Sequence, residues 1–338
     1  MPKAVVCFGE LLVRLNPPGR ELLLQSPRLE AHFGGAEANV AISLAQFGHD
    51  VRMASVVADN ALGEAAIGAL RRYGVHVDFV GRAPGRMGLY FLSTGAVRRR
   101  SKVLYDRAGS AFAAADPSSF DWKAIFAGAD WLHLSGVTPA VGANAAASAL
   151  IAVRTAKELG LTISFDGNYR AQLWKTWGGD GPATLREILG AATIAFVTER
   201  DLSLALGRDF AGKTEVDLRR KAYEAAFKAF PALERIAATF RVQHGVERHE
   251  LSGLIASRQL EASSKPYALD GIVDRIGAGD AFAAGVIHGL RSGKGDQYAI
   301  DFGVAAAAIK HSIPGDFNIA SLADVEEALA GDDLDVRR

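Results

Sequence analysis

Short apolar runs alternate with amphipathic segments along most of the chain, and this alternation limits the possible folds more than any other feature. Runs with strand character cover residues 4–8, 51–57, 75–80, 131–137, 161–165, 194–197 and 236–240. Apolar residues recur at helical spacing in segments 36–47, 62–73, 144–159 and 215–230. Strands that alternate with helices of about a dozen residues form parallel sheets that are covered on both faces. The sequence therefore predicts an α/β protein.

Composition excludes several classes of protein. The 338 residues can bury a large core, and Lys+Arg and Asp+Glu both number 38, so no global positive charge points to nucleic acid or a membrane surface. Cys7 is the only cysteine, which rules out an internal disulfide and a cysteine-based zinc cluster. The start of the chain differs from a signal peptide, and no apolar segment is long enough to span a bilayer. We expect a cytoplasmic protein that acts on a small molecule.

A glycine-rich segment near the C-terminus, residues 271–285, has the sequence GIVDRIGAGDAFAAG. We expect Ile272 and Val273 to end a buried strand, the glycines to form a tight turn, and Asp280 to open a helix. A helix N-terminus favours anions, and side-chain-poor glycines let phosphoryl oxygens approach its N–H groups. A carboxylate at this place suits proton abstraction from an attacking hydroxyl. For a lone motif, an ordinary turn with an N-capping Asp would be the better interpretation.

This segment resembles the D-T-x-G-A-G-D signature of the ribokinase-like (phosphofructokinase-B type) carbohydrate kinases. The resemblance implies that Asp280 is the catalytic base. It also implies an anion hole formed by Gly277, Ala278 and Gly279. Arg275 stands where Thr is commonest in the family, so the chain departs from the pattern just before the anion hole.

Further family motifs occur in the family's order from Gly9 to Asn318, so the resemblance covers nearly the whole chain. It implies a three-layer α/β/α sandwich with a small β-sheet lid, formed as a single kinase domain by residues 1–338. The lid would comprise about residues 12–33 and 87–107. Its second part contains two strand-like runs that flank the basic tip Arg98–Lys102, a pattern typical of a hairpin with a solvated turn.

Two motifs imply residues that bind the substrate. Gly34, Gly35 and Asn39 match a G-G-x-x-x-N motif that binds sugar hydroxyls in the family, although a Gly-Gly before a helix is more often only a turn. Residues 105–108 match the Y-D/Y-R-A segment of the branch that acts on 2-keto-3-deoxy sugar acids, in which the Arg faces the substrate carboxylate. The implied substrate-binding set is Gly34, Gly35, Asn39, Tyr90, Tyr105, Arg107, Arg170, Asp280 and Asp316.

A D-x-N-x-R-x-x-L-W run implies residues that bind the nucleotide. Residues 166–174 match this run at every fixed position. The run follows a predicted strand, where open α/β sheets bind ligands. The implied nucleotide-binding set is Asn168, Arg170, Thr198, Arg241, Gly245, Gly277 and Gly279. The chain departs from the family at 239–245, and Thr198 and Asp201 replace its N-x-x-E motif. Asp201 is the candidate for a magnesium contact through water.

Gly207–Thr214 satisfies the P-loop pattern G-x-x-x-x-G-K-T. A P-loop follows a buried strand directly, whereas the residues before Gly207 are predicted to be helical. We therefore interpret the segment as a surface loop between two helices. A P-loop nucleotide-binding protein remains the alternative from another functional class.

Together these features predict ATP-dependent phosphorylation of 2-dehydro-3-deoxy-D-gluconate to its 6-phosphate, a step of Entner-Doudoroff or hexuronate catabolism. Mg²⁺ would bridge the phosphates, and lid closure would exclude water. Another sugar kinase of the family, such as a fructokinase, is the alternative, although Arg107 and Arg170 favour an acidic substrate. The family often dimerises through the lid, so we expect a homo-oligomer without a nucleic-acid or membrane partner.

Overall fold

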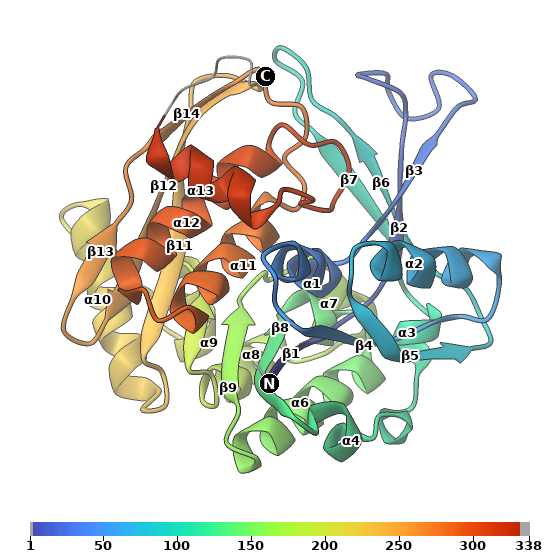
Figure 1. Ribbon diagram of the computed structural model, residues 1–338, viewed down its shortest axis with the longest axis horizontal. Coiled ribbons are helices and arrows are strands. Elements are labelled where there is room, and N and C mark those ends of the chain that lie inside the picture. Colours follow the sequence, from blue (N-terminus) through green and yellow to red (C-terminus); the bar gives the residue numbers. More distant parts are fainter. Residues whose placement is uncertain (1–2, 332–338) are drawn as a thin grey trace.

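The computed structural model describes residues 3–331, and a ten-stranded sheet runs through the centre of this part of the chain (Figure 1). The strand order is β13-β12-β11-β10-β9-β8-β1-β4-β5, and β14 pairs with β12. The strands are β1 (Ala4–Phe8), β4 (Val51–Ala58), β5 (His76–Ala83), β8 (Ala129–Ser135), β9 (Thr162–Asp166), β10 (Ile194–Phe196), β11 (Arg235–Gln243), β12 (Arg248–Ser257), β13 (Glu261–Ser263) and β14 (Tyr267–Asp270). All pairs from β11 to β5 are parallel, and those of β12 are antiparallel.

Helices cover both faces of this sheet, as the alternating pattern predicted. One layer contains α1 (Ala36–Gln46), α2 (Ala61–Arg72), α11 (Ala278–Arg291), α12 (Gly295–Lys310) and α13 (Leu322–Ala330). The other contains α3 (Ala111–Ala114), α4 (Trp122–Phe126), α6 (Ala143–Glu158), α8 (Gly181–Leu189), α9 (Glu199–Leu206) and α10 (Glu215–Ala229). Short segments α5 (Val137–Ala140), α7 (Ala171–Trp177) and the 3₁₀ turn Pro117–Ser119 complete the connections. The predicted α/β/α sandwich is confirmed.

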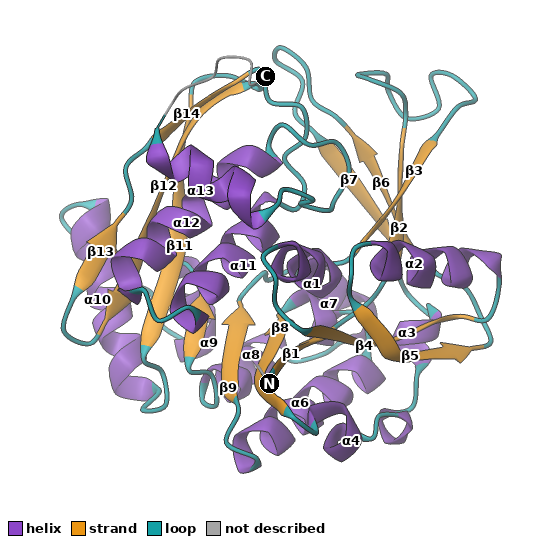
Figure 2. Cartoon of the chain, viewed as in Figure 1, coloured by secondary structure: helices purple, strands orange, loops and turns teal. Residues whose placement is uncertain are grey.

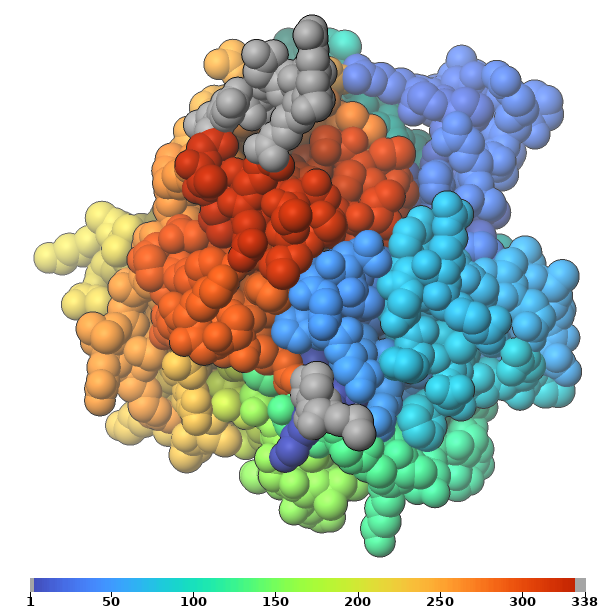
Figure 3. Space-filling model, viewed as in Figure 1, coloured from blue at the N-terminus to red at the C-terminus, as the bar shows by residue number. Residues whose placement is uncertain are grey.

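The buried strands explain this layering. Every residue of β1 is fully buried, so the run is apolar throughout instead of alternating. The aromatic ring of Phe8 packs against Phe112, Phe120 and Trp122 from the loops and helices of one face. Figure 3 shows the opposite layer, where α1 and α2 (blue) adjoin the C-terminal helices (orange and red).

A separate four-stranded sheet has the order β3-β2-β6-β7 (Figure 2). Its strands are β2 (Leu12–Asn16), β3 (Glu30–Gly34), β6 (Gly88–Ser93) and β7 (Lys102–Asp106). Strands β6 and β7 pair antiparallel, so the predicted hairpin around the basic tip is confirmed. Leu12, Tyr90 and Leu92 form a small apolar cluster that also contacts Ile276 of the glycine-rich segment. The small sheet therefore packs directly over that segment.

Two details of the glycine-rich segment differ from the prediction. Ile272 and Val273 do not end a strand, because β14 stops at Asp270 and Gly271 turns the chain at φ +68°. The N–H of Val273 instead donates to the carbonyl of His311 (2.9 Å), and its side chain is 54% exposed. Asp280 is the third residue of α11 and does not open it, since Gly277 is the N-cap.

The segment with the P-loop pattern is an exposed connection between α9 and α10, as predicted. Gly207 ends α9 in the left-handed conformation at φ 63°, and the Thr214 hydroxyl caps α10 by accepting a hydrogen bond from the Asp217 N–H. Between residues 3 and 331, no helix has both the length and the hydrophobicity that crossing a membrane would require.

Candidate active site

The carboxyl ends of the parallel strands meet at one edge of the large sheet, and charged and polar side chains follow several of these strands there. Glu10 follows β1, Asp166 ends β9 and Thr198 follows β10. Open α/β sheets bind ligands at this edge. The small sheet and the glycine-rich segment border the same edge, so residues that are far apart in the sequence meet here.

The glycine-rich turn is built for close backbone contact. Gly277 has φ +80°, a left-handed conformation that disfavours other residues. A Cβ atom on Gly277 would also overlap with the carbonyl oxygen of Asp316. Ala278 and Gly279 form the first turn of α11, where helical N–H groups have no intrahelical acceptor. Gly277, Ala278 and Gly279 thus form a cradle that suits phosphoryl oxygens.

Asp280 extends from this turn toward α1. Its carboxylate accepts a hydrogen bond from the side-chain amide of Asn39 over 2.6 Å. Burial of the carboxyl group raises the pKa of Asp280 to about 7; the bond from Asn39 lowers it and the charge of Glu37 raises it further. A carboxylate with a pKa near neutrality can accept and release a proton at physiological pH, which is the property required of a general base.

Asp316 lies on the other side of the turn. It accepts a hydrogen bond from the Tyr90 hydroxyl (2.6 Å), and its other oxygen is 3.1 Å from the Arg14 guanidinium. Arg14 also pairs with Asp274 (2.7 Å). A Cβ atom on Gly34 would overlap with the Asp316 carboxylate. Gly34 and Tyr90, two of the substrate-binding residues predicted on the small sheet, therefore converge on Asp316.

Gly35 connects the small sheet to α1. It is the N-cap of α1 at φ 144°, and a Cβ atom there would overlap with the carbonyl oxygen of Glu10. The close packing sets the start of α1 against the end of β1, which brings Asn39 within reach of Asp280.

Arg170 and Tyr105 meet across the boundary between the two sheets. The Arg170 Nε donates to the Tyr105 hydroxyl over 3.3 Å, and Arg170 is otherwise exposed. Its positive charge lowers the pKa of both Asp166 and Asp280, so it lies within electrostatic range of the site. Asn168 has a positive φ of 33°, which shapes the turn between Asp166 and Arg170.

Arg107 occupies a different setting. It is 5% exposed and donates through Nε to Glu10 over 2.6 Å, and Ser110 donates to the second Glu10 oxygen. Arg107 and Tyr105 line a cavity of about 220 Å³ between β7 and α7. The Nε of Arg107 is thus bound to the buried carboxylate of Glu10, and Arg170 is the more accessible cation.

Thr198 and Asp201 form a capping box at the start of α9. One Asp201 oxygen accepts from the Thr198 N–H (2.9 Å) and hydroxyl (2.8 Å). Among residues 3–331, no group of three His, Cys, Asp or Glu side chains is arranged to hold a metal ion. Thr198 and Asp201 would therefore contact Mg²⁺ only through water. The nucleotide phosphates would bind the ion directly.

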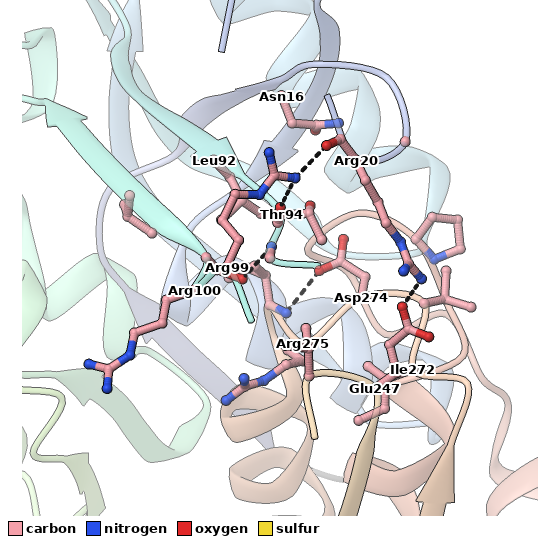
Figure 4. A pocket seen from close by; sticks show the side chains of 18 of the residues that line it. Asn16, Arg20, Leu92, Thr94, Arg99, Arg100, Glu247, Ile272, Asp274 and Arg275 are labelled. Atoms are coloured by element: carbon pink, nitrogen blue, oxygen red, sulfur yellow. Dashed lines mark hydrogen bonds and ion pairs between the residues drawn. The ribbon is translucent and has the colours of Figure 1, made fainter. Parts of the chain in front are cut away.

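A cavity of about 1050 Å³ lies between the small sheet and the glycine-rich segment (Figure 4). Arg241 and Gly245, two of the predicted nucleotide residues, line it together with Arg275. In the described part of the chain, no carboxylate lies within ion-pair distance of Arg241 or Arg275; in contrast, Arg20 pairs with Glu247 across the cavity. Burial lowers the pKa of Arg241, and so does the charge of Arg275. The wall therefore carries two arginines that are available for an anion.

Several charged residues of this site were not predicted as functional. Glu10, Arg14 and Asp166 are charged residues within or at the ends of apolar strands, a signal that could have identified them. Burial raises the pKa of Asp166 to about 8, and the negative charges of Asp280 and Asp201 add to this effect. Lys310 ends an Ala-rich helix and is fully buried, which nothing in its sequence context indicated.

Comparison with known proteins identifies the family of the chain. The pattern of the pfkB family carbohydrate kinases matches residues 2–319. A solved 2-dehydro-3-deoxygluconokinase from Thermotoga maritima is 35% identical, with a TM-score of 0.90 over 98% of this chain and 99% of that chain. A 2-dehydro-3-deoxygalactonokinase from Haloferax volcanii is 28% identical over the full length of both chains. A 2-dehydro-3-deoxygluconokinase from Bacillus subtilis is 29% identical over 93% of this chain and 91% of its own. The chain belongs to the pfkB family of carbohydrate kinases.

Proposed function

We propose that the protein transfers the γ-phosphoryl group of ATP to the 6-hydroxyl of 2-dehydro-3-deoxy-D-gluconate. The observation that carries this proposal is the position of Asp280, a carboxyl group with a pKa of about 7 in the first turn of α11, next to the glycine cradle. An acceptor hydroxyl and a phosphoryl group can approach each other at this point. The names of the relatives from Thermotoga maritima, Bacillus subtilis and Haloferax volcanii support a keto-deoxy sugar acid as acceptor.

The chemistry follows from the charges at the site. The oxygen of the sugar hydroxyl attacks the γ-phosphorus while Asp280 takes the hydroxyl proton. The bond between the γ-phosphorus and the leaving ADP oxygen breaks. The N–H groups of Gly277, Ala278 and Gly279 stabilise the negative charge of the transferring group. The Asn39 amide holds the carboxylate and favours its ionised form.

The nucleotide phosphates would extend from the glycine cradle along the arginine-lined cavity. Arg275 is two residues from Gly277, and Arg241 faces the same cavity. We assign Asn168, Arg170, Thr198 and Gly245 to the nucleotide as well, since all of them follow or extend strands at the same sheet edge or line the cavity. Mg²⁺ would neutralise the phosphate charge, with Asp201 acting through water.

The sugar acid would lie between the two sheets. Gly34, Gly35, Asn39 and Asp316 suit hydroxyl contacts, and the pair of Tyr105 and Arg170 suits the carboxylate. We retain Tyr90 and Arg107 as substrate contacts through their remaining donors and acceptors. In this proposal residues 1–338 act as one kinase domain, the small sheet acts as the lid, and the enzyme is a cytoplasmic homo-oligomer.

A substrate panel with ATP tests the proposal. We expect efficient turnover with 2-dehydro-3-deoxy-gluconate or its galactonate epimer, and turnover at least tenfold lower with fructose and ribose, because one lost charge-assisted contact corresponds to about tenfold or more. The two epimers are assayed separately, since relatives of both names match. Faster phosphorylation of fructose would refute the sugar-acid assignment and favour the fructokinase alternative.

A further inference from the structure

The side chain of Lys310 is the most deeply buried cation near the site. It is 0% exposed at the end of α12, and its ammonium group donates to the carbonyl oxygen of Ile313 over 2.8 Å. An ammonium has three donors, and an unpaired charge is unfavourable in the protein interior. No carboxylate of the described residues lies within ion-pair distance of it, so an ordinary buried salt bridge does not explain its presence.

Lys310 lies directly behind the glycine cradle. A Cβ atom placed on Gly277 would be 3.3 Å from the Lys310 Cε. The loop that follows Lys310 is hydrogen-bonded to the glycine-rich segment, since the N–H of Asp274 donates to the His311 carbonyl (3.2 Å) and that of Gly315 to the Asp274 carboxylate (3.0 Å). These bonds fix the position of the ammonium relative to the N-terminus of α11.

Charged residues from three segments of the chain affect the pKa of Lys310. Asp274, Asp316 and Asp280 favour its protonated form, whereas Arg14 and burial disfavour it; burial has the largest effect, so the pKa of Lys310 is lowered. Its positive charge also lowers the pKa of the neighbouring His311. Lys310 is thus electrostatically coupled to the candidate base and to the residues that support the cradle.

We propose that Lys310 is a positioning residue whose buried positive charge strengthens the cradle of residues 277–279 for the nucleotide phosphates and keeps Asp280 ionised. Because it lies behind the backbone, it acts through the electric field and makes no contact with the ligand. A fixed charge in a poorly solvated setting is effective over several ångströms, since little water screens it. The part that concerns Asp280 depends on the proposed kinase function.

Lys310→Met tests the charge while it preserves most of the side-chain volume. We expect the Kd for ATP, measured by calorimetry without sugar, to rise on the order of tenfold, since the field at the anion hole is lost. The acidic limb of the kcat/KM profile should move up by as much as about one pH unit, because the ionised Asp280 loses a nearby positive charge. Lys310→Arg should retain most of the wild-type behaviour.

Lys294→Met serves as the matched control. Lys294 caps the opposite end of the same helix, and its side chain is 49% exposed, so this change removes the same charge far from the cradle and should leave both measurements unchanged.

Unchanged ATP affinity and pH profile in a folded Lys310→Met variant would overturn the proposal. Loss of folding in both Lys310→Met and Lys310→Gln would also overturn it, by assigning Lys310 a structural role. A failed sugar-acid panel together with weaker ATP binding in the variant would refute only the proposed substrate.

Discussion

The side-chain amide of Asn39 lies 2.6 Å from the carboxylate of Asp280, across 241 positions of sequence. This contact joins the N-terminal turns of α1 and α11, which belong to the two ends of the chain. Both turns begin at a glycine with positive φ, Gly35 and Gly277. The proposed base is therefore held by a second helix as well as by its own.

Asp280→Asn should remove most turnover and leave the fold and ATP binding largely intact. Loss of a general base costs on the order of 10²–10⁴ in rate, whereas the N–H groups of the cradle remain in place. Steady-state kinetics with the sugar acid and calorimetry with ATP measure the two effects separately. Near-normal kcat in the folded variant would show that another group accepts the proton.

Asn39→Leu should shift the pH dependence of kcat/KM. The amide of Asn39 favours the ionised form of Asp280, so its removal raises the pKa of Asp280 above the value of about 7. Activity then requires a higher pH, and the deficit measured at pH 6 should shrink at pH 9. An equal loss of activity at every pH would instead indicate that Asn39 serves only to bind the sugar.

Arg170→Ala and Arg107→Ala should have different consequences. Arg170 is exposed, so its loss should raise KM for the sugar acid about tenfold to a hundredfold and change the free energy of unfolding little. Arg107→Ala leaves the buried carboxylate of Glu10 without its ion pair, which costs roughly 3–5 kcal/mol of stability. Neither change should raise KM for any residual activity on fructose, which has no carboxylate.

Denaturation and kinetics of each variant separate these effects, and the double variant Glu10→Gln, Arg107→Met is the control for the buried pair. It should recover stability relative to Arg107→Ala, because no unpaired charge remains. Wild-type stability in Arg107→Ala would contradict the structural role of the pair with Glu10.

Asp166→Asn should raise the melting temperature at pH 8 and change it little at pH 5. The pKa of Asp166 is about 8 in the folded protein and about 4 in an unfolded chain. The folded state therefore holds the proton more tightly, so Asp166 lowers stability progressively as the pH rises from about 4 to about 8. Asparagine cannot ionise, and a gain of a few °C at pH 8 is expected in thermal denaturation. A gain of equal size at both pH values would mean that ionisation is not the cause.

Lys213→Ala should leave the Kd for ATP and kcat/KM close to the wild-type values. Lys213 lies in the exposed connection between α9 and α10, and no strand precedes this loop. A P-loop lysine contacts the nucleotide phosphates, so its loss would abolish nucleotide binding. Collapse of ATP binding in this variant would revive the P-loop alternative.

The sequence by itself determined the layers of the fold and the place of the proposed chemistry. Continuous apolar runs such as residues 4–8 can be buried only between two helical layers, and they predicted the parallel sheet. The turn at Gly277 and the helix start near Asp280 have local sequence signals, whereas the assignment of Asp280 as the base rests on the resemblance of residues 271–285 to the family signature. Local signals also misplaced Ile272 and Val273, whose strand-like apolarity is overridden by the turn at Gly271.

Only the tertiary structure decided which charges meet. Arg107 and Glu10 are 97 positions apart, and Arg14 and Asp316 are 302 positions apart. Sequence spacing carries no information about such pairs, because the strand order and the packing of the small sheet bring them together. The burial of Lys310 behind Gly277 is decided in the same way, since the cost of placing a charge in the interior depends on which groups the complete fold arranges around it.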